Sequence, residues 1–235
     1  MINLRSRSYT KEYLDNENVP FADIRQNMKE LNTINTFLGG HKITLEGIKQ
    51  LMKDDTKPRS LTICEIGCGG GDNLKAIDKY FKRLNKPVHF IGIDIKQECI
   101  AFAKEQYPKL KAEWILSDYK KINFEDRKPD IIFSSLFCHH FTEAEIKEML
   151  LWMKRNSVIG FFINDLHRHP LAWYSIKWIT KIFSRSYLVK NDAPLSVARS
   201  FTKKEWASAL NTAGLEHYTI KWKWAFRYLV IYKNE

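Results

Sequence analysis

The sequence predicts an α/β fold, in which a mostly parallel sheet with helices on both faces is preceded by a helical extension. From residue 61 onward, short apolar runs alternate with charged amphipathic stretches, which is typical of strand–helix–strand units. A cluster of glycines follows the first of these apolar runs. The chain has 235 residues, a length that fits one such domain with a modest addition.

Residues 1–57 are expected to form a helical cap. Apolar side chains recur there at helical spacing, at Phe21, Ile24, Met28, Leu31 and Ile34. Gly39 and Gly40 are expected to end this helix before a second helical segment over 44–52. Residues 58–235 are then the domain that carries the sheet.

Five apolar runs are expected to form the parallel strands. They cover residues 61–67, 88–95, 112–118, 130–137 and 157–165. Amphipathic stretches between them predict helices, one of which is capped by Thr142 with Glu145 at the capping-box position. We therefore expect strands and helices to alternate through this part of the chain.

A segment over about 166–200 follows the fifth strand and is expected to form a lid. Thr202 and Glu205 predict a further capping box, for a helix that ends at Gly214. The last two apolar runs lie close together near the end of the chain. They are typical of an antiparallel pair that closes the edge of the sheet.

Composition indicates a globular protein, because 44% of the residues are hydrophobic and 28% are charged. No apolar run approaches the roughly 20 residues that cross a bilayer, and the first residues lack the apolar stretch of a secretory signal. We therefore expect a cytoplasmic location. The four cysteines lack paired spacing with matching histidines, so neither a metal site nor a disulfide framework is expected.

The net charge of +11 is spread along the whole chain. This spread favours a solvated basic surface over attraction to a nucleic acid. Peripheral contact with an anionic membrane is the open alternative. The sequence does not indicate an oligomeric state.

The strongest motif, CEIGCGGGDN, joins the first strand to the next helix, as the glycine loop of a Rossmann-like domain does. Gly67, Gly69 and Gly71 would let the backbone approach a ligand closely. A dinucleotide loop would have glycine where Asp72 stands, and a carboxylate there repels phosphates. S-adenosylmethionine (SAM) has no phosphate and carries positive charge, so Glu65 and Asp72 favour SAM over NAD.

Acidic residues at the ends of the next two strands complete the predicted cofactor site. Asp94 is placed to accept hydrogen bonds from both ribose hydroxyls, and Ile95 to lie against the adenine. Asp118, followed by Tyr119, is placed to accept from the adenine amino group. Each acid alone is typical of a solvated strand end, but three successive strand ends of this kind favour a binding site.

These motifs resemble motifs I to IV of class I SAM-dependent methyltransferases. The resemblance is carried by EIGCGGG, GIDI, LSDY and DIIFSSLFCHHF, within residues 61–166. The chain is also similar to the ubiquinone/menaquinone-methyltransferase-like group of small-molecule methyltransferases, through LNTINTFLGGH, NDLHRHPLAWY and LSVARSF. The resemblance implies a seven-stranded sheet with an antiparallel last strand. It also implies SAM as cofactor, S-adenosylhomocysteine (SAH) as product, and contact between Ser134 and the methionine end of SAM.

His139 and His140 follow the fourth strand directly, where an acceptor should meet the methyl group. An enzyme that uses SAM must align a nucleophile with the S–CH3 bond and, for a phenol or enol, remove its proton. Either imidazole suits the role of general base, and we prefer His140. The sequence fits equally well a structural role, in which one histidine caps a helix or fixes the loop while the other packs.

The segment after the fifth strand supplies the candidate acceptor-binding residues, which are His167, Arg168, His169, Trp173 and Arg199. Pro170 favours an extended residue before it, so the preceding polar groups are expected in a loop over the site. An ordinary solvated turn is the alternative for each of them. Arg199 is expected to pair either with a substrate anion or with Asp192.

One face of the lid is expected to be apolar and the opposite face basic. The apolar residues are Leu171, Trp178, Ile179, Ile182 and Phe183, and the basic residues are Lys177 and Lys181. This pattern favours a helix packed on the core over contact with a membrane. An aromatic-rich lid of this kind would shape a pocket for an apolar or aromatic acceptor.

The sequence therefore predicts a SAM-dependent methyltransferase of secondary metabolism that methylates an oxygen of a hydroxylated, lipophilic aromatic or polyketide-like small molecule. Alternatives are C-methylation of a quinone-type ring, an RNA methyltransferase, and a protein that binds SAM without catalysis. Against RNA, the fourth strand ends in SSLFCHH rather than in Asn/Asp-Pro-Pro followed by an aromatic residue. Asp72 disfavours an NAD-dependent oxidoreductase.

Overall fold

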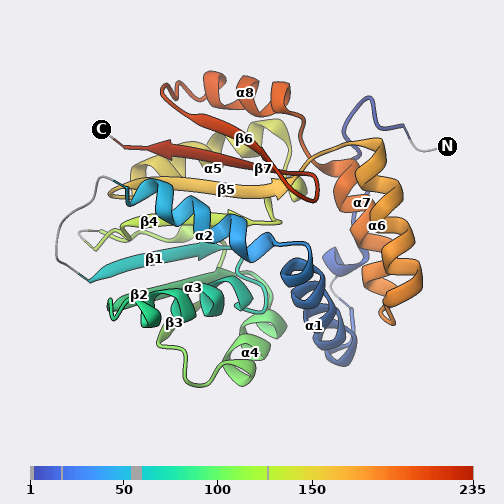
Figure 1. Cartoon of the computed structure of the whole chain (residues 1–235), viewed down its shortest axis with the longest axis horizontal. Helices are drawn as coiled ribbons and strands as arrows, with labels where there is room; N and C mark the ends of the chain where they lie inside the picture. Colours follow the sequence, from blue (N-terminus) through green and yellow to red (C-terminus); the bar gives the residue numbers. More distant parts are fainter. Residues whose placement is uncertain (1–2, 17, 54–59, 126, 235) are drawn as a thin grey trace.

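The computed structural model describes residues 3–16, 18–53, 60–125 and 127–234. Its strands are β1 (Leu61–Ile66), β2 (Val88–Asp94), β3 (Ala112–Leu116), β4 (Ile131–Ser135), β5 (Gly160–Leu166), β6 (Thr219–Lys223) and β7 (Arg227–Lys233). They form one seven-stranded sheet in the order β3-β2-β1-β4-β5-β7-β6 (Figure 1). β7 runs antiparallel to both of its neighbours, β5 and β6, and the other pairs of neighbouring strands are parallel. This mostly parallel sheet confirms the predicted fold class.

The helices are α1 (Phe21–Phe37), α2 (Gly40–Leu51), α3 (Asp72–Arg83), α4 (Gln97–Gln106), α5 (Glu143–Asn156), α6 (Pro170–Phe183), α7 (Tyr187–Arg199) and α8 (Lys203–Thr212). The described residues also form short 3-10 helices, which are η1 (Tyr13–Asp15), η2 (Tyr119–Lys121) and η3 (Cys138–His140). Both predicted capping boxes are present, at Thr142 with Glu145 and at Thr202 with Glu205. The predicted boundary between cap and sheet domain, at residues 57 and 58, lies outside the described residues.

Helices cover both faces of the sheet (Figure 1). α2 and α3 pack on one face, where Ile48 belongs to the core, and α5 and α8 pack on the other, where Met149 does. Successive side chains of a strand point to opposite faces. Phe133 of β4 therefore packs in the core that contains Ile48, and Ile132 packs in the core that contains Met149. Both sides of the central strands are therefore buried.

The N-terminal segment and the lid lie together beyond one end of the sheet (Figure 1). α6 packs on α7, η1 also packs on α7, and α1 lies between α7 and α4. The two segments thus enclose one region although they are far apart in the sequence. None of the described helices combines the length and apolar character needed to cross a bilayer.

The orientation of α6 differs from the prediction. Leu171, Trp178 and Ile182 are exposed, while the buried side chains of the helix are Ala172 and Thr180. α6 lies against α7 and a cavity rather than on the sheet, so small side chains fill its contact with the rest of the lid. The prediction that the large apolar face packs on the core is wrong.

Candidate active site

A cavity of about 720 Å³ opens at the carboxyl ends of the parallel strands. The loops after β1, β2, β3 and β4 form one side of it, and η1, α1, α6, α7 and the turn between β6 and β7 form the other. Its volume lies in the range of small-molecule and cofactor sites. The position agrees with the general rule that ligands of open α/β sheets bind beyond the carboxyl ends of strands.

Two of the three predicted loop glycines line this cavity. Gly67 has φ of +66°, and a β-carbon there would lie 2.2 Å from the Phe137 ring. Gly69 has φ of +49° and lines the cavity with little packed against it. Gly71 does not line the cavity, because it packs against Trp114, where a β-carbon would lie 2.5 Å from the indole ring.

Glu65 presents an unsatisfied carboxylate oxygen in a buried position on the cavity wall. Asn73 donates to Oε1 over 2.8 Å, whereas Oε2 has no hydrogen-bond partner. Burial, and then the negative charge of Asp72, raise the pKa of Glu65 well above its usual range. A cationic ligand at this wall would offset both effects, because opposite charges attract strongly in a poorly hydrated site.

The predicted nucleoside-binding residues lie at the strand ends. Asp94 accepts backbone N–H groups of Gly69, over 2.8 Å, and of Lys96, over 2.9 Å. Asp118 caps η2, and Ile95 is an exposed residue at the rim. Asp94, Ile95, Asp118 and Tyr119 all line the cavity.

Ser134 does not line the cavity. It is fully buried, with Oγ 3.3 Å from the sulfur of Cys138. Neighbouring Ser135 lines the cavity instead, and its hydroxyl has no hydrogen-bond partner. Neighbouring side chains of a strand point in opposite directions. Ser135 therefore faces the cavity while Ser134, one position earlier, faces the core.

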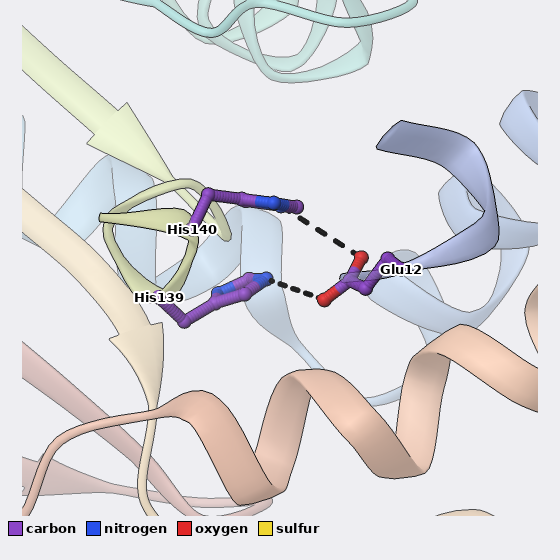
Figure 2. A group of neighbouring side chains, drawn as sticks. All are labelled: Glu12, His139 and His140. Atoms are coloured by element: carbon purple, nitrogen blue, oxygen red, sulfur yellow. Dashed lines mark ion pairs between the residues drawn. The ribbon is translucent and has the colours of Figure 1, made fainter. Parts of the chain in front are cut away.

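His139 and His140 line the cavity and converge on Glu12 (Figure 2). Nε2 of His139 lies 3.5 Å from Oε1 of Glu12, and Nε2 of His140 lies 3.8 Å from Oε2. Each Nδ1 faces another carboxylate, at 2.9 Å for His139 and Asp165 and at 3.3 Å for His140 and Asp15. Both rings are thereby oriented with Nε2 toward the same point.

The two histidines differ in access. The His139 side chain is 3% exposed, and its backbone N–H also donates to Asp165. The His140 side chain is 24% exposed. His140 is therefore the better placed of the two to meet a ligand, and His139 is the more deeply fixed in the fold.

Glu12 is a candidate site residue that the sequence analysis missed. It is 4% exposed, and burial raises the pKa of its carboxyl group to about 7. Ser196 of α7 donates to its Oε1 over 2.7 Å. The short stretch around Glu12 has no motif that would predict this role, because the contact joins the N-terminal segment to the end of β4.

Asp192 and Arg199 of α7 hold the N-terminal segment over the site. Asp192 accepts the backbone N–H groups of Tyr13, over 2.8 Å, and Leu14, over 3.0 Å. Arg199 pairs with Asp15 at 3.3 Å, so of its two expected partners the one within the chain, Asp192, is wrong. It also donates to the backbone carbonyl groups of both histidines. Arg199 does not line the cavity.

The other predicted acceptor-binding residues also lie away from the cavity lining. Arg168 is buried in an ion pair with Glu205 at 2.6 Å, and His167 packs on the Tyr228 ring. His169 caps α6, and the Trp173 ring forms a cation–π contact with Lys177. Pro170 starts a helix at once, so the residues before it serve the fold. The wall that α6 gives to the cavity consists of Ala172, Ser175, Ile176 and Ile179.

The Glu12, His139 and His140 side chains could also ligate a divalent cation. Each offers one ligand atom, and these atoms lie within 4.8 Å of one another. A carboxylate on the Nδ1 side of each ring is the arrangement that usually supports metal-binding histidines. Metal binding and proton transfer would use the same Nε2 atoms.

Residues 63–157 match the family model described as a methyltransferase domain. This range runs from β1 through α5 and includes the glycine loop and both histidines. No curated protein sequence matches the chain.

Solved structures of methyltransferases are similar in fold over most of this chain. The plantazolicin methyltransferase BpumL in complex with SAH is 18% identical, covers 92% of this chain and 95% of its own, and has a TM-score of 0.67. Human N-acetylserotonin methyltransferase in complex with SAM is 14% identical, with 92% and 56% covered and a TM-score of 0.64. Magnesium protoporphyrin IX methyltransferase from Synechocystis PCC 6803 with SAH is 13% identical, with 84% of each chain covered and a TM-score of 0.56. These likenesses confirm the predicted fold.

Proposed function

We propose that this chain, a SAM-dependent methyltransferase by its domain and fold, methylates an oxygen of a hydroxylated, lipophilic aromatic or polyketide-like small molecule. The observation that carries the proposal is the placement of His140, backed by Glu12 and Asp15, on the wall of the cavity that also contains the glycine loop. In this proposal the cap, predicted over residues 1–57, covers the cavity through η1 and α1, and residues 166–200 act as a lid.

SAM would occupy the side of the cavity formed by the strand ends. Its positively charged methionine portion would lie near the unpaired oxygen of Glu65, and its ribose near Asp94. Asp118 and Ile95 are available at the rim for the adenine. The backbone at Gly69 leaves room for this approach, whereas the Phe137 ring occupies the space beside Gly67.

The acceptor would occupy the side formed by the helices. α1 contributes Leu31 and Ile34 to this wall, Leu38 lies just after it, and α6 contributes Ile176 and Ile179. Such a surface suits an apolar body, because burying it removes apolar area from water. A hydroxyl group on that body would form hydrogen bonds with Glu12, His139 and His140, here called the histidine cluster.

The transfer requires one nucleophile and one proton acceptor. Nε2 of His140 would take the hydroxyl proton as the oxygen attacks the methyl carbon, and the C–S bond would break with its electron pair on sulfur, which leaves SAH. Glu12 would stabilise the imidazolium that forms, while Asp15 keeps the ring oriented through Nδ1.

The experiment is transfer from labelled SAM to a panel of phenols and quinols, with the product structure determined by mass spectrometry and NMR. We expect a methyl ether with at least one lipophilic phenol. Transfer to ring carbon would favour C-methylation of a quinone-type ring, and transfer to RNA with salt-dependent binding would favour the RNA alternative.

The matched variants are His140→Ala and His89→Gln, the latter at an exposed histidine on β2. We expect His140→Ala to lower kcat by about 100-fold or more while SAM affinity is kept, and His89→Gln to leave both unchanged. Wild-type kcat in His140→Ala would remove this residue from the proposed chemistry.

A further inference from the structure

The outward side of α6 is an exposed apolar face, here called the α6 face. It consists of Leu171, Tyr174, Trp178 and Ile182, which are spaced to lie on one side of a helix. Leu171 is 61% exposed, Trp178 59% and Ile182 66%. Phe183, at the end of the helix, is also exposed. Large apolar side chains gathered on one helix face mark a contact surface more often than isolated ones do.

Basic side chains flank the α6 face on one side. Lys177 and Lys181 are exposed, and each lies over a tryptophan ring, at 4.6 Å from the Trp173 centroid and 5.4 Å from the Trp178 centroid. The sequence of α6 contains no acidic residue. Within the part of the chain that the structure describes, neither lysine forms an ion pair with a carboxylate. The face therefore complements a negatively charged partner.

The α6 face adjoins the cavity. The neighbouring side of the same helix contributes Ser175, Ile176 and Ile179 to the cavity wall. Trp222 and Trp224, near the turn between β6 and β7, line the cavity and are themselves exposed. Exposed aromatic side chains thus stand on two elements that border the cavity.

We propose that the α6 face docks on the surface of an anionic lipid bilayer. Tryptophan and tyrosine prefer the boundary between headgroups and acyl chains, and lysines beside them gain from negatively charged headgroups. A helix with an apolar side and a basic flank lies in the plane of that boundary. A folded protein partner would need acidic groups placed to match two flexible lysines, whereas an anionic bilayer presents its charge everywhere.

Docking would bring the cavity close to the lipid. An apolar acceptor dissolved in the bilayer could then pass between α6 and the tryptophans of the turn without crossing water. This second part rests on the proposed function, because it assumes a lipophilic acceptor. The docking itself does not.

The test is co-sedimentation of the full chain with vesicles of phosphatidylcholine alone and of phosphatidylcholine with phosphatidylglycerol in a three-to-one ratio. We expect binding to the mixed vesicles at low salt, and weaker binding to neutral vesicles or at high salt. The partition coefficient of the double variant Lys177→Gln/Lys181→Gln on the mixed vesicles should be roughly 25-fold lower, at roughly fivefold for each lysine. The partition coefficient of Trp178→Ser/Ile182→Ser should be lower than that of the wild type by about tenfold or more on both kinds of vesicle.

The matched control is Leu84→Ser/Val158→Ser, which removes two exposed apolar side chains from elsewhere on the molecule, after α3 and before β5. We expect this variant to bind vesicles as the wild type does. Circular dichroism and thermal unfolding check that every variant is folded.

The proposal would be overturned if the wild type did not bind vesicles, or if Trp178→Ser/Ile182→Ser bound them as strongly as the wild type does. Analytical ultracentrifugation provides a second readout: a dimer that Trp178→Ser/Ile182→Ser dissociates, with no binding to vesicles, would assign the α6 face to self-association. Transfer to a short, water-soluble phenol without vesicles tests the proposed chemistry separately. If that transfer fails while vesicle binding follows the expected pattern, the proposed function is wrong and the docking stands.

Discussion

The carboxylate of Glu12, in the N-terminal segment, lies 3.8 Å from Nε2 of His140, which follows β4. This separation is longer than a hydrogen bond and short enough for a strong electrostatic interaction. Because Glu12 is buried, it has few competing contacts with water. A change in the charge of one group should therefore be felt by the other.

Glu12→Gln should change how stability depends on pH. Burial raises the pKa of Glu12 to about 7 in the folded chain, above the usual value in an unfolded chain. The folded state therefore holds an extra proton, and the stabilisation from it is present in acid and lost as pH rises through about 7. Urea unfolding at pH 6 and pH 9 should show wild type losing stability of about 1.4 kcal/mol that Glu12→Gln does not lose.

The same variant should lower kcat by about tenfold to 100-fold, because an amide stabilises an imidazolium less well than a carboxylate does. The KM for SAM should stay near that of the wild type. A pH–stability curve of Glu12→Gln that follows the wild-type curve would contradict the assignment of the raised pKa to this group.

His139→Ala should act mainly on stability. His139 is buried against Asp165. Burial by itself raises the pKa of the Asp165 carboxyl group, but the charge and the hydrogen bond of His139 outweigh burial and lower that pKa. Removing the imidazole leaves a buried carboxylate with fewer partners, which costs about 2–4 kcal/mol. Chemical denaturation measures this loss, and His217→Ala, at an exposed histidine, is the control. A loss equal to that of the control would mean that the pair with Asp165 contributes nothing to folding.

Binding of SAM should release protons from Glu65. Burial and the charge of Asp72 raise the pKa of this carboxyl group, and a cationic ligand nearby should lower that pKa. Calorimetry at neutral pH in buffers of different ionisation enthalpy should show release of up to about one proton. Glu65→Gln should abolish the release, whereas Glu216→Gln, at an exposed site, should keep it. Proton release that survives in Glu65→Gln would point to another acid.

Chelation should leave methyl transfer intact if the histidine cluster acts as a proton acceptor. Added Zn²⁺ should inhibit, because it would occupy the Nε2 atoms that take the proton. His140→Ala should bind Zn²⁺ more weakly than the wild type, as titration calorimetry can measure. An enzyme that loses activity in EDTA and regains it with a divalent cation would instead assign these three side chains to a metal centre.

Much of the fold could be predicted because its signals are local. Short apolar runs predict the strands, and the capping boxes at Thr142 and Thr202 predict two helices that the structure contains. The glycine loop and the acids at the strand ends follow from the same periodicity, since parallel strands deliver their carboxyl ends to one edge. Asp94 and Asp118 accordingly line one cavity.

Predictions made one residue at a time were less successful in the lid. The sequence predicts that Arg168 and Arg199 are available to an acceptor. In the structure Arg168 forms an ion pair with Glu205, and Arg199 donates a hydrogen bond to the backbone carbonyl of His139. Ser134 and Ser135 are equivalent in composition, and only the direction of each side chain separates them.

The order of strands and helices along the chain, the glycine loop and the two histidines at the end of β4 follow from local sequence, because hydrogen bonding and burial repeat over a few residues. The contact of Glu12 with those histidines and the outward orientation of the large apolar side chains of α6 follow only from the packing of the folded chain. Both depend on how the N-terminal segment and the lid pack together, and contacts between distant segments leave no periodic trace in either one.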